Sequence, residues 1–185
     1  MRNAKGFTLI ELIMVIVIAA VLGTAGYHLM TFMTRHTFYL PNQLRTDLAV
    51  AEALEVMVEG DSSGSATAAK GLRFASAVTA ATASSVTVTN QDGQTATYTF
   101  SGGGLTRTIG ASTVNLPYFM PADVDFTGSF SYFNSTDALL SFPIADPTLI
   151  RRIQISLSAT QGTSGDFDRW EGSSGQSTSV KLYGV

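Results

Sequence analysis

The chain has 185 residues, a formal net charge of −3 at pH 7 and no cysteine. Its length suits one domain with one additional segment. The lack of cysteine excludes disulfides and thiolate metal sites, and the acidic balance argues against non-specific nucleic-acid binding, which requires a basic face.

The amino-terminal part of the sequence contains a long apolar run. From Phe7 to Met33, the only acid is Glu11 and the only histidine is His28. A run of this length predicts a helix that spans a membrane, because a backbone in lipid must hydrogen-bond to itself. An acid inside such a run is costly in hydrocarbon and marks a functional site with a partner.

The residues before the apolar run are polar and basic. Arg2 and Lys5 precede it, whereas only Arg35 follows it closely. This distribution predicts that the first residues stay in the cytoplasm and that the remainder is exported. A secretory signal carries its small-residue cleavage site after the apolar run, but here the well-placed small residue is Gly6, before it.

The stretch Lys5-Gly6-Phe7-Thr8-Leu9-Ile10-Glu11-Leu12-Ile13 resembles the leader and cleavage signature of type IV prepilins and type II secretion pseudopilins. The resemblance implies that a membrane-embedded prepilin peptidase cuts after Gly6 and methylates the new amine of Phe7. It implies an inner-membrane anchor that an assembly platform then builds, with other pilin or pseudopilin subunits, into a periplasmic or extracellular filament. The family often has a carboxyl-terminal disulfide, and this chain departs from that pattern.

A physical argument gives Glu11 a role in assembly. Cleavage after Gly6 creates a cation at Phe7, and helices stacked with an axial stagger can bring the amine of one subunit to the carboxylate of another. A buried charge alone is very unfavourable, whereas a buried pair is tolerated. Glu11 is therefore expected to set the register between subunits. The alternative is an acid that reaches back to the cytoplasmic interface.

Beyond Thr34 the sequence becomes amphipathic. Pro41 is expected to end or kink the first helical stretch, and Asn42 to cap a new helix that reaches Glu59. Glycines in the segment 60–64 end this helix. Its apolar face is predicted to pack on a sheet through residues spaced by three or four positions: Leu44, Leu48, Ala51, Leu54 (or Glu55) and Val58. Met57 and Leu54 are expected to join this core.

From Lys70 onward the period of the pattern changes to two, which predicts strands. Asp92-Gly93 indicates a hairpin, and Gly102-Gly103-Gly104 indicates a further turn. The expected strands cover residues 72–75, 85–90, 95–100, 104–109, 124–133, 149–159 and 179–183, with a long loop over 160–177. In the strand over 149–159, Ile153, Ile155 and Leu157 should face one side.

These elements predict an α+β fold of the type IV pilin kind, with a long amino-terminal helix packed on an antiparallel sheet of five to seven strands. The predicted parts are the leader at 1–6, the membrane and filament-core helix at 7–34, the amphipathic continuation at 35–60 and the β-rich domain at 61–185.

The β-rich part offers little catalytic chemistry. It has no nucleophile elbow, no phosphate-binding loop and no histidine, so an enzyme is not expected. His28 and His36 are eight residues apart and are interpreted as interfacial or subunit-contact residues, since they lack a third metal ligand. No cofactor is expected, although Asp166, Asp168 and Glu171 are calcium candidates; a solvated acidic loop is the preferred interpretation.

Aromatic residues recur through the β-rich part. Core packing accounts for most of them, and an exposed subset is the alternative, as a surface for a partner. The residues are Tyr118, Phe119, Phe126, Phe130, Tyr132 and Phe133, together with Trp170 in a polar segment.

The preferred functional hypothesis is a minor pilin or minor pseudopilin that sits near the filament tip and primes assembly. The segments 150–155 and 177–182 resemble those of minor subunits of moderate size, and the presence of Glu11 disfavours the tip subunit that lacks this acid. A major pilin of the filament shaft is the alternative within the class. A non-polymerising membrane-anchored β-domain that binds a ligand is the alternative outside it.

Overall fold

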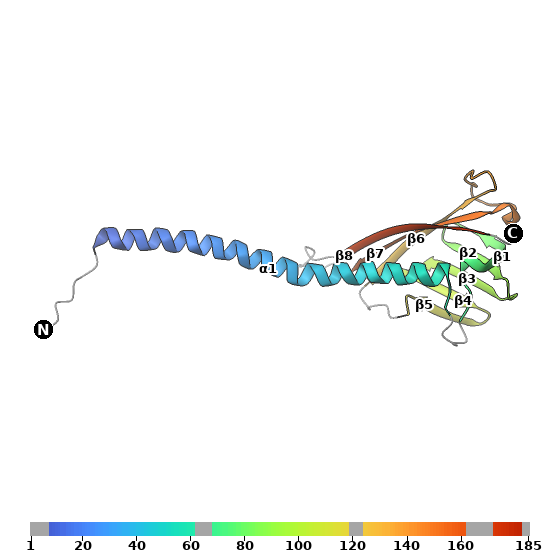
Figure 1. Cartoon of the computed structure of the whole chain (residues 1–185), viewed down its shortest axis with the longest axis horizontal. Coiled ribbons are helices and arrows are strands. Elements are labelled where there is room, and N and C mark those ends of the chain that lie inside the picture. Colours follow the sequence, from blue (N-terminus) through green and yellow to red (C-terminus); the bar gives the residue numbers. More distant parts are fainter. Residues whose placement is uncertain (1–7, 62–67, 119–123, 162–171, 183–185) are drawn as a thin grey trace. The chain divides into compact units, whose positions relative to one another are not determined.

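The computed structural model describes residues 8–61, 68–118, 124–161 and 172–182. The chain divides into two compact units, Met1–Leu40 and Pro41–Val185. Figure 1 shows the elements in chain order, beginning with the helix α1, Leu9–Val58, which contributes residues to both units.

Helix α1 runs without interruption through Pro41. Of the two predicted outcomes at Pro41, an end or a kink, the end is therefore wrong, and Asn42 lies inside the helix instead of capping a new one. A proline lacks only its own backbone donor, so a long helix can continue past it when its other hydrogen bonds are made. Pro41 does coincide with the boundary between the two compact units.

The first unit holds one helix that is long and apolar enough to cross a membrane, Leu9–Thr34, with a mean hydropathy of 2.5. Its leucine, isoleucine and valine side chains are exposed around the helix, as for Leu9, Ile13 and Val17. The hydroxyls of Thr24, Thr31 and Thr34 donate to carbonyls one turn back, at 2.8–2.9 Å. These bonds satisfy polar groups that would otherwise be costly in lipid.

The second unit contains eight strands among the described residues, all paired antiparallel in two sheets. The five-stranded sheet follows chain order: β1 Ala75–Ala81, β2 Ser85–Asn90, β3 Thr95–Ser101, β4 Gly104–Ile109 and β5 Ser112–Leu116. The three-stranded sheet has β7 at its centre: β6 Val124–Phe133, β7 Arg152–Gln161 and β8 Gly172–Lys181. This arrangement confirms the predicted α+β class.

Most strands lie where the alternating pattern predicts them. The bounds of β2, β4 and β6 agree, and positive φ angles at Gly93, Gly102 and Gly103 place the two expected turns between β2, β3 and β4. Ile153, Ile155 and Leu157 are buried on one face of β7, as predicted.

Other strand predictions are wrong. Residues 72–74 form a short 3₁₀ turn before β1. The strand predicted over 149–159 is present as β7, but it begins at Arg152, after a second 3₁₀ turn over Pro147–Leu149. Strand β5 was not predicted. Strand β8 begins at Gly172, within the segment 160–177 that was predicted as a loop. Residues 162–171 of that segment lie outside the described residues. One sheet was expected and two are present. The serine-rich sequence of β8 lacks an alternating pattern, and it forms a strand because β7 provides a partner along its full length.

One hydrophobic core joins both sheets to the end of α1. The helix buries Ala49, Val50, Ala53 and Met57 in this core, whereas Leu44 and Leu48 are 59% and 60% exposed. The predicted apolar stripe is therefore wrong by about a third of a turn at Leu44 and Leu48. Leu54 and Met57 belong to the core, as predicted, and Val58 packs against it. Both faces carry apolar residues at helical spacing, and the buried one combines small side chains with Leu54 and Met57.

Two glycines bring the end of α1 against the start of the β-rich part. Gly60 has a φ of +87° and forms an isolated antiparallel bridge with Lys70. A Cβ on Gly60 would lie 2.2 Å from the carbonyl oxygen of Ala69, and one on Gly71 would lie 2.3 Å from that of Val58. Only glycine permits this approach between two backbones, and Gly60 ends the helix as predicted.

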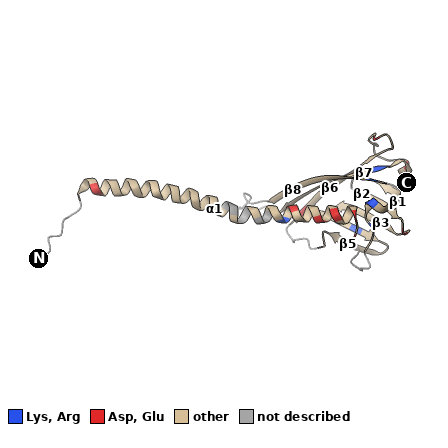
Figure 2. Cartoon of the chain, viewed as in Figure 1, with Lys and Arg blue, Asp and Glu red and all other residues tan. Residues whose placement is uncertain are grey.

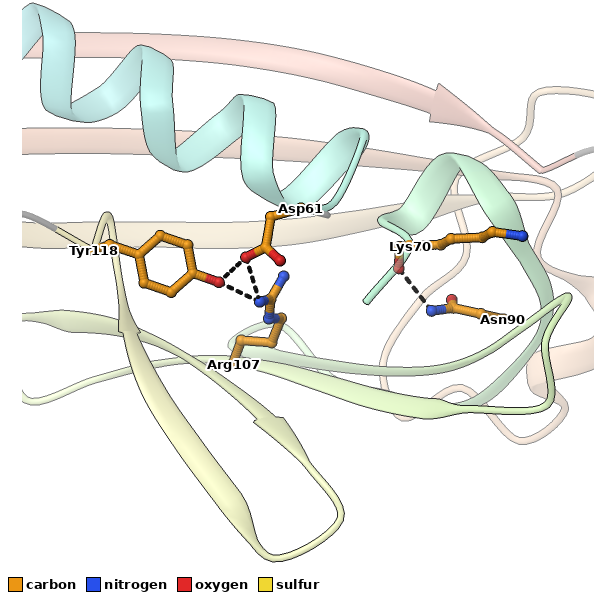
Figure 3. Close-up of polar contacts among 5 residues, drawn as sticks. All are labelled: Asp61, Lys70, Asn90, Arg107 and Tyr118. Atoms are coloured by element: carbon orange, nitrogen blue, oxygen red, sulfur yellow. Dashed lines mark hydrogen bonds and ion pairs between the residues drawn. The ribbon is translucent and has the colours of Figure 1, made fainter. Parts of the chain in front are cut away.

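A buried ion pair also joins these parts. The Arg107 side chain on β4 is fully buried, and its Nη2 lies 2.9 Å from Oδ2 of Asp61, directly after Gly60. The hydroxyl of Tyr118 contacts both groups, as Figure 3 shows. In the same view, Nδ2 of Asn90 donates to the carbonyl of Lys70 at 2.6 Å. The short segment after the helix is thereby bonded to the five-stranded sheet at two points.

Candidate assembly site at the start of the helix

The first turn of α1 contains a reciprocal cap between Thr8 and Glu11. The backbone N–H and the hydroxyl of Thr8 donate to Oε2 of Glu11 at 2.9 and 3.0 Å, and the backbone N–H of Glu11 donates to the Thr8 hydroxyl at 3.4 Å. The carbonyl of Thr8 accepts the first helical hydrogen bond, from Leu12. Thr8 is thus the N-cap and Glu11 the third helical residue of a capping box.

The capping box gives Glu11 a role that the sequence reasoning missed. The signal was present, because a threonine followed three residues later by a glutamate is the usual sequence of this motif. The carboxylate also lies at the end of the helix where the macrodipole is positive. Both hydrogen bonds that the carboxylate accepts go to one oxygen, Oε2, and Oε1 has no partner within the described part of the chain.

The helix beyond Glu11 presents an apolar surface with small residues in it. Figure 2 shows one acidic segment at the start of α1, followed by a long stretch without charge. A Cβ at Gly23 or Gly26 would meet nothing within 4 Å, so both positions are open to an approaching helix. His28 is exposed and contacts the ring of Tyr27, whereas the side chain of His36 is not described.

Several predicted site residues lie outside the described residues. These are the cleavage and methylation positions Gly6 and Phe7, the calcium candidates Asp166, Asp168 and Glu171, and the aromatics Phe119 and Trp170. Within the described ranges, no three His, Cys, Asp or Glu side chains gather in a group that could hold a metal ion.

The described aromatic residues belong mainly to the core, as predicted. Phe126, Phe130 and Tyr132 are buried, and the ring centroids of Phe100 and Phe130 are 5.0 Å apart. Burial raises the pKa of the Tyr132 hydroxyl, which donates to the carbonyls of Thr82 and Ser85. Tyr118 is 37% exposed and takes part in the contact with Asp61.

Comparison with known proteins gives one family match. The prokaryotic N-terminal methylation motif matches residues 1–27, which include the capping box and most of the apolar span. Neither the curated proteins nor the solved structures that were compared gave a match. With its apolar amino-terminal helix and its antiparallel sheets, the chain has a pilin-like α+β layout, and its first 27 residues carry the motif that marks type IV pilin-like or pseudopilin-like prepilins.

Proposed function

We propose that this chain is cleaved after Gly6, methylated at Phe7 and assembled through α1 into the filament of a type IV pilus or a type II secretion pseudopilus. One observation carries the proposal: the methylation motif continues into a helix whose apolar span is exposed and whose first turn holds a single acid, Glu11. The inner membrane covers this surface before assembly, and neighbouring helices cover it in a periplasmic or extracellular filament.

Glu11 supplies specificity that the apolar surface lacks. In lipid, no hydrophobic force separates a correct helix contact from a shifted one, since the lipid tails are as apolar as the side chains. A buried carboxylate without a partner is strongly unfavourable, and a cation on a neighbouring subunit removes that cost only in one register. The prepilin peptidase would create this cation at the amine of Phe7.

The capping box is compatible with such a pair. Oε2 of Glu11 holds the first turn of its own helix, while Oε1 is available to accept from the methylated amine of another subunit. A carboxylate can accept several hydrogen bonds at once, so the two roles do not compete.

Substitutions of Glu11 separate the two roles. Glu11→Gln keeps an acceptor for the capping box and removes the charge, whereas Glu11→Ala removes both. If a charge pair sets the register, both variants should insert in the membrane normally and both should be absent from sheared filaments. Filaments formed normally by Glu11→Gln but not by Glu11→Ala would assign Glu11 to helix capping alone. Normal incorporation of both variants would show that assembly needs neither the charge nor the cap, and it would overturn the proposed role of Glu11. Absence of the unsubstituted chain itself from filaments would support the non-polymerising anchor.

Processing is tested by the intact mass of the protein expressed with and without a prepilin peptidase. The proposal requires a mature chain that starts at Phe7 and carries a methyl group. A chain that still begins at Met1 in the presence of the peptidase would contradict it.

Within this class we assign the chain to the minor subunits that prime assembly at the tip. The support is the resemblance of the segments 150–155 and 177–182 to those of minor subunits. Quantitative mass spectrometry of purified filaments tests the assignment, because a minor subunit should be present in far fewer copies than the shaft subunit. A chain that makes up most of the filament mass would instead be the major pilin.

A further inference from the structure

A basic pocket lies at one end of the three-stranded sheet. It has a volume of about 300 Å³, and three of its six lining residues are cations, whereas one is an acid. The lining residues are Asn134, Ser135, Asp137, Arg151, Arg152 and Lys181. This concentration of positive charge stands out in a chain whose formal net charge is −3.

The strand register places like charges side by side in this pocket. Arg152 on β7 is directly opposite Lys181 on β8, and Arg151 precedes Arg152 in the chain. Like charges directly opposite each other destabilise a sheet. Asp137 contacts Nε of Arg152 at 2.9 Å, but its side chain is 74% exposed, so it offsets little of this repulsion. Lys181 forms no ion pair within the described residues.

Both guanidinium groups are held in position by contacts that leave donors available. Nη1 of Arg151 donates to the carbonyls of Thr148 and Ile150 at 2.7 and 3.2 Å. Arg152 donates from Nε to Asp137, and its guanidinium carbon lies 3.7 Å from the centroid of the Phe133 ring. The remaining nitrogens of both side chains have no hydrogen-bond partner in the described chain. Donors fixed in this way lose little entropy when they bind a ligand.

The loop that carries Asp137 is also fixed. Oδ1 of Asn134 accepts from the backbone of Thr136 and Ala138 and from the Thr136 hydroxyl, at 2.8–3.0 Å. Asp137 has a φ of +59°, which is uncommon outside glycine. The bonds of Asn134 therefore hold this wall of the pocket in a conformation that a free chain would rarely adopt.

We propose that the basic pocket binds an oxyanion, a phosphate or carboxylate group of a small ligand, through Arg151, Arg152 and Lys181. An oxyanion accepts two parallel hydrogen bonds from a guanidinium fork and neutralises the charges that the register brings together. The volume lies at the lower end of the range for ligand pockets, which suits a small acid. The proposal does not depend on assembly of the chain into a filament.

The test is an NMR titration of the full chain in zwitterionic detergent micelles with inorganic phosphate and, separately, with acetate. Sodium chloride at matched ionic strength is the reference. Saturable shifts at the amides of residues 134–137, 151–152 and 181 are expected with at least one oxyanion and not with chloride. Saturation by phosphate alone would assign the pocket to phosphate groups, and saturation by acetate to carboxylates. Equal, non-saturating shifts with all three salts would overturn the proposal.

Three substitutions sharpen the test. Lys181→Gln removes a cation without breaking any contact described, and Arg152→Lys keeps the charge but loses the fork; each should weaken binding about tenfold. Arg45→Gln makes the same change in net charge at an exposed site on α1, and it should leave binding unchanged. Equal weakening by Arg45→Gln and Lys181→Gln would show that only the overall charge matters and would also overturn the proposal. Since Lys181→Gln disturbs no packing, the test remains decisive even if Arg152→Lys is poorly folded.

Discussion

The guanidinium of Arg107 on β4 and the carboxylate of Asp61, just beyond the end of α1, form an ion pair of 2.9 Å inside the second unit. The Arg107 side chain is fully buried, and that of Asp61 is 13% exposed. Arg107 is also directly opposite Tyr98 on β3, and burial raises the pKa of Tyr98 while the charge of Arg107 partly lowers it. The pair therefore connects the helix end to the interior of the five-stranded sheet.

Removal of Arg107 should strongly destabilise the second unit. Arg107→Met removes the cation that faces the largely buried carboxylate of Asp61, and breaking a buried pair on one side costs about 3–5 kcal/mol. The measurement is the free energy of unfolding of the full chain in detergent, from urea denaturation. Arg73→Met is the matched control, because the pair of Arg73 with Glu59 is largely exposed and should contribute less than about 1 kcal/mol. Similar costs for both variants would contradict a structural role of the buried pair.

Gly60 should not tolerate a side chain. Gly60→Ala combines a left-handed backbone, which costs about 1–2 kcal/mol, with a Cβ that collides with the backbone of residues 69–71. Gly93→Ala has a similar φ of +77° with open space around it, so it should show only the conformational cost. Urea denaturation of both variants measures the difference. Equal destabilisation would mean that the close approach at Gly60 contributes nothing.

The face that α1 turns to the core can be tested by truncation. Met57→Ala should cost about 2–5 kcal/mol, because it leaves a cavity in the core. Leu48→Ala, at the exposed face, should change the free energy of unfolding by less than about 0.5 kcal/mol. A larger cost for Leu48→Ala would restore the helix face predicted from the sequence.

Thr8→Ala should weaken the first turn of α1 without preventing assembly. Loss of an N-cap costs about 1 kcal/mol, whereas the charge of Glu11 and its Oε1 remain. We expect faster amide hydrogen exchange in the first turn and normal filament yield. Thr24→Ala, inside the span, is the control and should leave exchange in the first turn unchanged. Loss of filaments by Thr8→Ala with normal processing would show that the cap itself is needed for assembly.

Stability should fall at alkaline pH. Burial raises the pKa of Tyr98 and Tyr132 above their ordinary value of 10.0, so the folded state holds their protons more tightly than the unfolded state. The contribution of these two hydroxyl groups to the free energy of unfolding is fully present below pH 10. As the pH rises above 10, this contribution declines by up to about 1.4 kcal/mol per pH unit for each tyrosine. Urea denaturation between pH 9 and 12 measures the slope. The Tyr98→Phe/Tyr132→Phe double variant should show a smaller slope, and an unchanged slope would refute this origin.

The apolar span Leu9–Thr34 could be predicted from the sequence. The apolar run, the single acid Glu11 and the residues before it indicated a membrane helix and a prepilin signature. The structure has a helix long and apolar enough to cross a membrane, and the methylation motif matches residues 1–27. Lipid imposes one backbone conformation on such a run, so local composition is sufficient there. The strands with strict alternation, such as β2 and β4, were equally predictable from the sequence, because each buries one face.

The tertiary structure alone decided the remainder. After Pro41 the sequence has apolar residues on two neighbouring faces of the helix. Packing in the core decided that the face with Ala49, Val50 and Ala53 is buried and that the one with Leu44 and Leu48 is exposed. The pairing of Arg107 with Asp61, the strand at β8 and the basic pocket each depend on residues far apart in the chain. A pattern along the chain records which residues are apolar, but only packing decides which of them meet, because burial and pairing depend on neighbours that the local sequence does not contain.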